Sequence, residues 1–99
     1  MKKIYQIDQL LKKIKLEKTK GKKVVHCHGV FDLVHIGHIK HFQEAKENGE
    51  FLIVSITADK YVNKGLGRPI FNENLRAEFL SSLTCIDAIY INNHLTSEK

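Results

Sequence analysis

Two histidines, His35 and His38, stand three residues apart in the segment His-Ile-Gly-His, directly before a helical pattern. A turn that leads from a strand into a helix presents backbone N–H groups and the positive end of the helix dipole, which together attract phosphate. The same dipole disfavours cations, so two histidines here are a poor choice for stability alone. They are suited to donate hydrogen bonds to a phosphoryl group that gains charge in a transition state. The spacing therefore predicts phosphoryl or nucleotidyl transfer, which depends mainly on positioning and electrostatics.

One glycine precedes this motif and one lies within it. Gly29 would let the backbone approach a ligand closely, and Gly37 would keep bulk away between the two imidazoles. A metal site is one alternative, because His41 continues the three-residue spacing and two further histidines precede the motif at positions 26 and 28. No cysteine or carboxylate completes a recognised zinc spacing, and the sequence has neither the GxGxxG nor the Walker pattern. Ordinary surface or capping histidines remain the other alternative.

The elements that must position these side chains follow from hydrophobic periodicity. The sequence predicts strands at residues 24–28, 51–56 and 88–91, and helices at residues 8–18, at residues 36–48 and after Asn72. Asp8 and Asn72 are the expected N-caps, and Gly49 is the expected left-handed C-terminal cap. Alternating strands and helices with short links predict a Rossmann-like, doubly wound parallel α/β sheet. Such sheets bind ligands at the carboxyl ends of their strands, here residues 29–38, residues 58–69 and the tail after Asn92.

The apolar stripes of the three helices should face this sheet. The expected stripes are Leu10, Leu11 and Ile14 in the first helix, Ile39, Phe42 and Ala45 in the second, and Leu75, Phe79 and Leu83 in the third.

The chain has 99 residues and a formal net charge of +5, which fits one small domain. Residues 1–23 hold nine lysines against two acidic residues, whereas the rest has seven basic against nine acidic side chains. We therefore divide the chain into an N-terminal basic helix (1–21) and a catalytic domain (22–99). The basic face is expected to be solvated, with polyanion or partner docking as the alternative. Nucleic-acid binding is not expected, because that charge does not lie on the body that carries the motif.

Location and redox state follow from what the sequence lacks. No apolar run approaches the length of a membrane span, and the start has no signal-peptide pattern, so a cytoplasmic protein is expected. Cys27 and Cys85 are accordingly expected to be reduced, buried thiols.

The segment from His28 to His38, HGVFDLVHIGH, resembles the signature of the cytidylyltransferase-like nucleotidyltransferases. That family includes the glycerol-3-phosphate cytidylyltransferases and the adenylyltransferase domains of bifunctional heptose and sugar-kinase proteins. The similarity continues through residues 51–59, 63–69 and 74–78, and covers roughly residues 22–93.

The resemblance implies transfer of AMP or CMP from ATP or CTP to a phosphorylated sugar or polyol, with release of pyrophosphate and usually with Mg²⁺. The partners would be the nucleotide, the phosphorylated acceptor and a fused or separate sugar-kinase domain. The catalytic residues carried over by position are His35, His38, Lys64 and Arg76. The residues carried over to nucleotide, metal or phosphate binding are Gly29, Val30, Phe31, Asp32, Asp59 and Arg68, and Gly37 joins them from its place between the histidines. No residue is assigned as a dedicated metal ligand.

Three of these residues have ordinary alternatives. Arg76 lies near the first turn of its helix, where a cation is unfavourable, and the alternative to a site role is an ion pair with Glu73. Lys64 would otherwise be a solvated loop lysine, and Asp59 a turn or cap residue.

Two departures from the family pattern bear on activity. Val30 stands where many relatives carry Thr or Cys, so a side-chain contact is lost while a backbone contact survives. The family continues with another helix, another strand and a Ser/Thr-rich helix start beyond the position of Lys99, so we expect a truncated fold and a fragment of uncertain activity. A fragment would leave sheet edge and apolar surface uncovered, which predicts self-association as a homodimer.

Two other functions stay open from the sequence. A nucleotide-binding module without turnover would use the same turn. A fragment of a class I aminoacyl-tRNA synthetase shares the His-Ile-Gly-His motif, but residues 59–76 fit the small transferases better.

Overall fold

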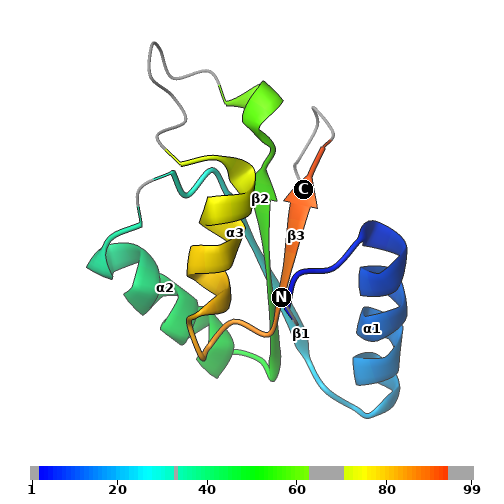
Figure 1. Cartoon of the computed structure of the whole chain (residues 1–99). Helices are drawn as coiled ribbons and strands as arrows, with labels where there is room; N and C mark the ends of the chain where they lie inside the picture. The colour runs from blue at the N-terminus through cyan, green and yellow to red at the C-terminus, as the bar shows by residue number, and fades with distance from the viewer. Residues whose placement is uncertain (1–2, 33, 63–70, 94–99) are drawn as a thin grey trace.

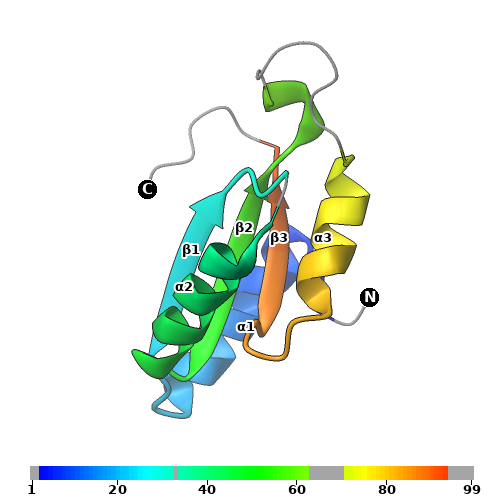
Figure 2. The ribbon, with the colours of Figure 1, turned by 90° about the vertical axis from the view of Figure 1, so that its left-hand side faces the viewer.

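The computed structural model describes residues 3–32, 34–62 and 71–93. One parallel sheet contains three strands in the order β1 (Val24–Gly29), β2 (Phe51–Thr57) and β3 (Ala88–Asn92). Helices α2 (Ile36–Glu47) and α3 (Glu73–Ser81) cover one face, and α1 (Ile7–Thr19) covers the other (Figures 1 and 2). The expected Rossmann-like α/β class is thereby confirmed. No helix within the described ranges is long and apolar enough to cross a membrane.

Strand β2 is the middle of the sheet and its most buried element. Six of its seven residues, from Phe51 to Ile56, are buried. The run is almost continuously apolar because its alternate side chains face helices on opposite sides of the sheet. Its register is parallel with both neighbours: Val54 pairs with Cys27 of β1 and with Ile89 of β3.

The core divides into two apolar clusters, one on each face of the sheet. The larger one joins α2 and α3 to the sheet and contains Phe42, Ala45, Leu52, Val54, Ile56, Ala77, Leu80, Ile86 and Ile89. The smaller one lies under α1 and contains Leu10, Phe51, Ile53 and Ala88. The α1 segment thus packs on the same sheet that carries the histidine motif, while the division at residue 21 stays a prediction.

Two helix ends differ from the sequence prediction. The N-cap of α1 is Gln6, which forms a capping box with Gln9, and Asp8 lies in the first turn. Helix α2 ends with Asn48 as its C-cap, and Gly49 does not adopt a left-handed conformation, so both cap assignments were wrong. Gly49 is needed for close packing instead, because a Cβ there would overlap Val25 Cγ2.

The predicted apolar stripe is right for α2 and largely wrong for α3. Phe42 and Ala45 are buried in α2 as expected. In α3, Leu75 and Phe79 are about half exposed, and the buried face is formed by Arg76, Ala77 and Leu80. In α1, Leu10 is buried but Leu11 is exposed.

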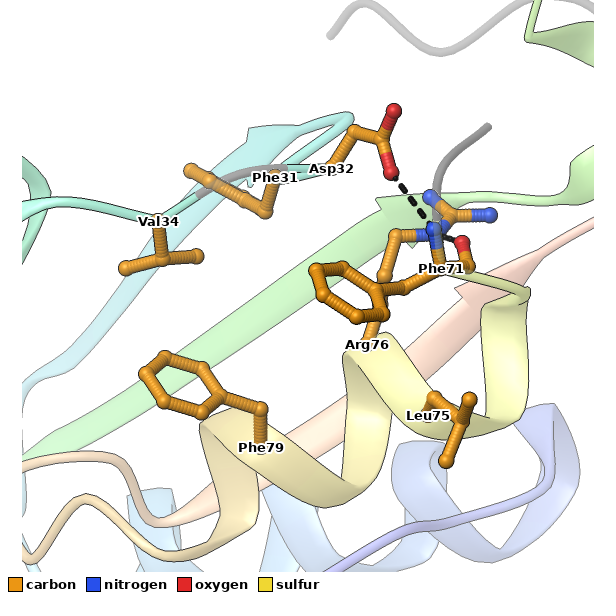
Figure 3. Close-up of a pocket in the computed structure, with 7 residues that line it drawn as sticks. All are labelled: Phe31, Asp32, Val34, Phe71, Leu75, Arg76 and Phe79. Carbon is orange, nitrogen blue, oxygen red and sulfur yellow. Dashed lines mark hydrogen bonds between the residues drawn. The ribbon is translucent and has the colours of Figure 1, made fainter. Parts of the chain in front are cut away.

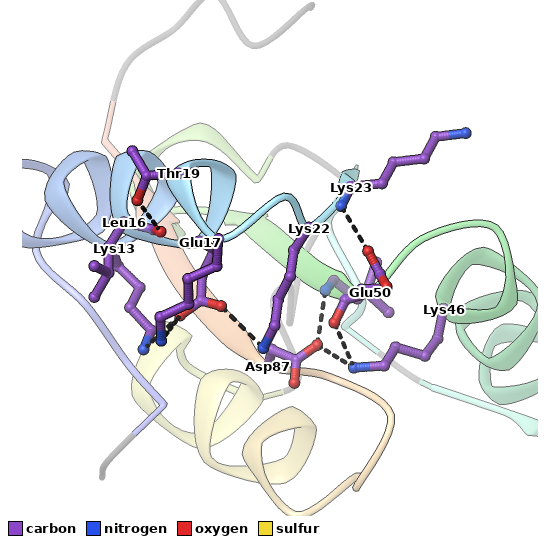
Figure 4. Close-up of polar contacts among 11 residues, drawn as sticks. Lys13, Leu16, Glu17, Thr19, Lys22, Lys23, Lys46, Glu50 and Asp87 are labelled. Carbon is purple, nitrogen blue, oxygen red and sulfur yellow. Dashed lines mark hydrogen bonds and ion pairs between the residues drawn. The ribbon is translucent and has the colours of Figure 1, made fainter.

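The lysines near the end of α1 surround one buried carboxylate. Glu17 pairs with Lys13 at 3.0 Å and with Lys22 at 3.1 Å (Figure 4). It also pairs with Lys20 at 3.7 Å. The hydrogen bonds from Lys13 and then Lys22 lower the pKa of Glu17 to about 2. Part of the basic charge is therefore balanced inside the fold. Both cysteines are free thiols and are partly buried.

Candidate functional site

The histidine motif lies where β1 passes into α2, at the carboxyl edge of the parallel sheet (Figure 1). The 3-10 helix η1 (Asp59–Tyr61), which follows β2, and the amino end of α3 lie at the same edge. Because all strands run in one direction, the fold brings segments far apart in sequence to one place. The described parts of residues 29–38 and 58–69, which are two of the three expected ligand-binding segments, therefore lie at the same edge of the sheet.

The turn after β1 is strained at Phe31, whose φ of 53° lies in the left-handed region. This conformation costs a residue with a side chain about 1–2 kcal/mol. The Phe31 ring lies over Gly29, where a Cβ would come within 2.7 Å of the ring. It also makes edge contacts with the rings of His38 at 5.6 Å and Phe42 at 5.2 Å between centroids. Gly29 is thus required by the folded-back ring, and its contact with a nucleotide stays a prediction.

His35 and His38 form a reciprocal cap at the amino end of α2. The Nδ1 atom of His35 accepts the Gly37 N–H at 3.0 Å, and the His35 N–H donates to His38 Nδ1 at 3.1 Å. Each Nδ1 is an acceptor and therefore carries no proton, so a neutral ring must carry its proton on Nε2. A Cβ at Gly37 would meet His35 Cε1 at 2.8 Å, so glycine at this position leaves room for the His35 ring.

This cap explains how two histidines are tolerated at the positive end of a helix. Their ring centroids are 4.1 Å apart, so two positive charges there would repel each other. Burial, and then the charges of His35 and His41, hold the pKa of His38 below its ordinary value of 6.5. The arrangement favours neutral rings that bond the backbone through Nδ1 and keep Nε2–H as a donor. Such donors, with the helix dipole behind them, are suited to bind an anion.

Arg76 and Asp32 join the turn to α3. Arg76 is only 2% exposed, and its Nη1 donates to the carbonyls of Val30 and Thr57, both at 2.8 Å. Asp32, which is also buried, accepts the Phe71 N–H at 3.0 Å, and the Phe71 carbonyl accepts from Arg76 Nε at 3.0 Å (Figure 3). Asp32 therefore links the turn to the segment that precedes α3.

Asp59 is the ionic partner of Arg76. Its Oδ1 lies 2.6 Å from Arg76 Nη2, and its N–H donates to Glu73 Oε1 at 2.9 Å. Arg76 thus pairs with the start of η1, which follows β2, rather than with Glu73 in its own helix. Sequence reasoning missed the anchoring role of Glu73, although an acidic residue in the first turn of a helix was its available signal.

A cleft of about 300 Å³ opens between the turn and α3 (Figure 3). Its lining is mainly apolar and consists of Phe31, Asp32, Val34, Phe71, Leu75, Arg76 and Phe79. The half-exposed residues Phe71, Leu75 and Phe79 lie here, which explains why the stripe predicted for the core faces outward.

Two predicted site residues lie outside the part of the chain that the structure describes. Lys64 and Arg68 both belong to residues 63–70, so their predicted contacts with phosphates stay predictions.

His26 and His28 lie apart from the pair. His26 Nε2 and His28 Nδ1 lie 2.7 and 2.6 Å from Ser55 Oγ, on the face of the sheet that α1 covers. Among the residues described, no group of three or more histidine, cysteine or acidic side chains is arranged to hold a metal ion. The described part of the chain therefore gives the alternative of a histidine metal site no support.

Comparison with known proteins gives consistent matches. The sequence profile of the cytidylyltransferase-like family matches residues 26–99. Over 91 residues, the chain is 42% identical to the bifunctional protein HldE of Geotalea uraniireducens and 43% identical to HldE of Geobacter metallireducens. Each alignment covers 90% of this chain and 19% of the relative, so the chain spans about a fifth of the length of these curated relatives.

A solved structure shares the fold. The crystal structure of the lipopolysaccharide core biosynthesis protein from Thermoplasma volcanium matches with a TM-score of 0.67 and 33% sequence identity. The match covers 73% of this chain and 59% of that chain.

Proposed function

The chain belongs to the cytidylyltransferase-like family, and from this premise we propose that it transfers AMP or CMP from ATP or CTP to a phosphorylated sugar or polyol. The observation that carries the proposal is the reciprocal cap of His35 and His38. It supports a pair of neutral Nε2–H donors at the positive end of α2, where a triphosphate would bind.

The reaction assigns a definite task to these donors. A phosphate oxygen of the acceptor attacks the α-phosphorus of the nucleotide, and the bond from that phosphorus to the bridging oxygen of the β-phosphate breaks. The products are a nucleoside diphosphate derivative of the acceptor and pyrophosphate. Negative charge grows on the phosphoryl oxygens and on the leaving pyrophosphate as the bonds change. His35 and His38 would stabilise that charge by hydrogen bonds without taking up a proton.

Mg²⁺ fits this site as a companion of the nucleotide. Mg²⁺ binds oxygen ligands, keeps several waters and is held mainly by substrate phosphates with one or two carboxylates. The turn offers the carboxylate of Asp32, one oxygen of which accepts the Phe71 N–H. When bound, the ion would neutralise part of the phosphate charge.

The remaining site assignments rest on the family pattern. Lys64 and Arg68 would meet the phosphates from the segment that follows η1 in sequence. Gly29, Val30 and Phe31 would line the nucleotide with backbone groups, although the Val30 carbonyl already accepts from Arg76.

The partners are proposed on similar grounds. The relatives are named as bifunctional proteins and are about five times as long as their matched region. This supports a second domain, for which we propose a sugar kinase. We also propose a cytoplasmic location, as expected from the sequence. The half-exposed Phe71, Leu75 and Phe79 support a homodimer.

Pyrophosphate release tests the activity. The complete product of the coding sequence is incubated with ATP or CTP, Mg²⁺ and a panel of sugar and polyol phosphates. We expect release with at least one pair of substrates, and a loss on the order of 10²–10³-fold in His38→Ala, as for other donors to a developing anion. Lys40→Ala, on the exposed side of α2, is the control and should stay close to wild type.

Two outcomes would contradict the proposal. No pyrophosphate with any pair would remove the transfer reaction, and nucleotide binding without product would favour a binding module. An unchanged rate in His38→Ala would remove His38 from the mechanism.

A further inference from the structure

The strained turn at Phe31 needs contacts that hold it in place. Within the described ranges, Phe31 is the one residue other than glycine with a positive φ. A residue in this region persists only where its surroundings fix it from more than one side. The ring contacts with His38 and Phe42 fix the side chain.

Arg76 holds the backbone directly before the strained residue Phe31. Its Nη1 donates to the carbonyl of Val30, the residue directly before Phe31. The same nitrogen donates to the carbonyl of Thr57 at the end of β2, and Nε donates to the Phe71 carbonyl. The Arg76 side chain therefore joins three segments that come from different parts of the sequence.

The guanidinium is committed to this task. Its four hydrogen bonds described above go to protein oxygens at 2.6–3.0 Å, and its charge is paired with Asp59. With a side-chain exposure of 1%, it offers little surface to a ligand. A lysine could not replace it, because a single ammonium cannot span carbonyls that a planar fork reaches in several directions.

We propose that Arg76 is a positioning residue of the nucleotide site and not a ligand of the phosphates. By holding the Val30 carbonyl, it keeps Phe31 in its left-handed conformation, and through the Phe31 ring it sets the place of His38. The functional part rests on the proposed triphosphate site. The structural part, which is the coupling of Arg76 to the His38 ring, does not.

The test compares Arg76→Lys, which keeps the charge, with Arg76→Met, which keeps an unbranched apolar stem and removes the charge. Lys40→Met removes an exposed charge from α2 and is the control. The first measurement is the nitrogen and Cε1–H NMR signals of His38 in the ligand-free chain. The second is binding of inorganic tripolyphosphate at two salt concentrations. Circular dichroism verifies that each variant is folded.

We expect both Arg76 variants to shift the His38 signals before any ligand is added. We expect them to weaken tripolyphosphate binding alike, roughly tenfold or more, because small displacements of a binding group are costly. The charge in Arg76→Lys should not rescue binding, and Lys40→Met should leave the His38 signals unchanged. Asp59→Asn removes the ionic partner of Arg76 and should shift the same His38 signals in the same direction and to a smaller extent. If the Arg76 variants do not fold, Asp59→Asn decides whether Arg76 positions the His38 ring.

Two results would overturn the proposal. One is that the NMR signals of His38 do not shift in folded Arg76 variants. If these variants do not fold, the same result in Asp59→Asn would overturn the proposal. The other is binding that Arg76→Lys preserves and Arg76→Met loses, with a smaller salt dependence, as expected for a direct phosphate contact. Failure of the wild-type chain to bind tripolyphosphate would count against the proposed function, whereas the NMR comparison would still decide the role of Arg76 in the fold.

Discussion

His35 has two roles: it caps α2, and it is proposed to bind phosphate. The substitutions His35→Ala and His35→Ser separate these roles. In His35→Ala both the cap and the Nε2–H donor are removed. In His35→Ser, the hydroxyl can accept the hydrogen bond from the Gly37 N–H, which His35 Nδ1 accepts at 3.0 Å in the wild type. The serine side chain is too short to replace the Nε2–H donor. The two variants therefore differ in the cap and share the loss of the donor.

The two losses have different magnitudes. Replacing a capping residue by alanine costs about 1 kcal/mol of stability. For a small protein with a urea m-value of about 2 kcal/mol/M, this moves the unfolding midpoint by roughly 0.5 M. A hydrogen bond to a charged group contributes about 1.5–3 kcal/mol, so its loss weakens triphosphate binding roughly 10- to 100-fold.

Urea unfolding followed by circular dichroism and calorimetric titration with ATP and CTP measure these quantities. We expect His35→Ser to unfold near the wild-type midpoint and His35→Ala about 0.5 M lower. Both should bind nucleotide comparably weakly. Equal midpoints for the two variants would refute the capping role, and wild-type affinity in His35→Ser would refute the donor role.

Three further predictions follow from the same geometry. His41→Gln removes one of the charges that lower the pKa of His38, so an NMR titration should give a higher pKa for His38 than in wild type. The neutral form of His38 is favoured in the folded state, so wild-type stability should fall as the pH drops below about 6.5 and through the folded pKa, whereas His41→Gln should lose less. Gly49→Ala should destabilise the chain by about 1–3 kcal/mol in urea unfolding, because its Cβ would overlap Val25; an unchanged midpoint would show that the contact relaxes freely. Phe79→Ser should weaken self-association in analytical ultracentrifugation if the apolar cleft is the dimer surface, and an unchanged dimer would place that surface elsewhere.

Local sequence patterns predicted helices and strands well where those patterns themselves cause the structure to form. The apolar run of β2 is buried on both faces, and Asn72 caps α3 through the Leu75 N–H at 2.8 Å. These features depend on periodicity and on hydrogen bonds within one turn, which neighbours in sequence decide. The errors at Asp8 and Gly49 are of one or two residues, or concern why a glycine is needed.

The side of α3 that faces the core could not be obtained in this way. Leu75 and Phe79 are the more apolar residues, yet Arg76 is buried and they are half exposed. Arg76 is buried because carbonyls from two other segments and Asp59 are within reach of its guanidinium. Partners at such sequence separations do not appear in the periodicity of a helix.

The sequence alone determined the class of the fold, the place of the turn that is proposed to bind phosphate and the pair of histidines in it, because each depends on residue types at short spacing. The tertiary structure alone decided how those residues are used. It placed the Phe31 ring over Gly29, bonded His35 and His38 through Nδ1 so that Nε2 carries the proton of each neutral ring, and turned Arg76 inward. The physical reason is that tautomer, strain and burial are set by atoms that the fold brings together.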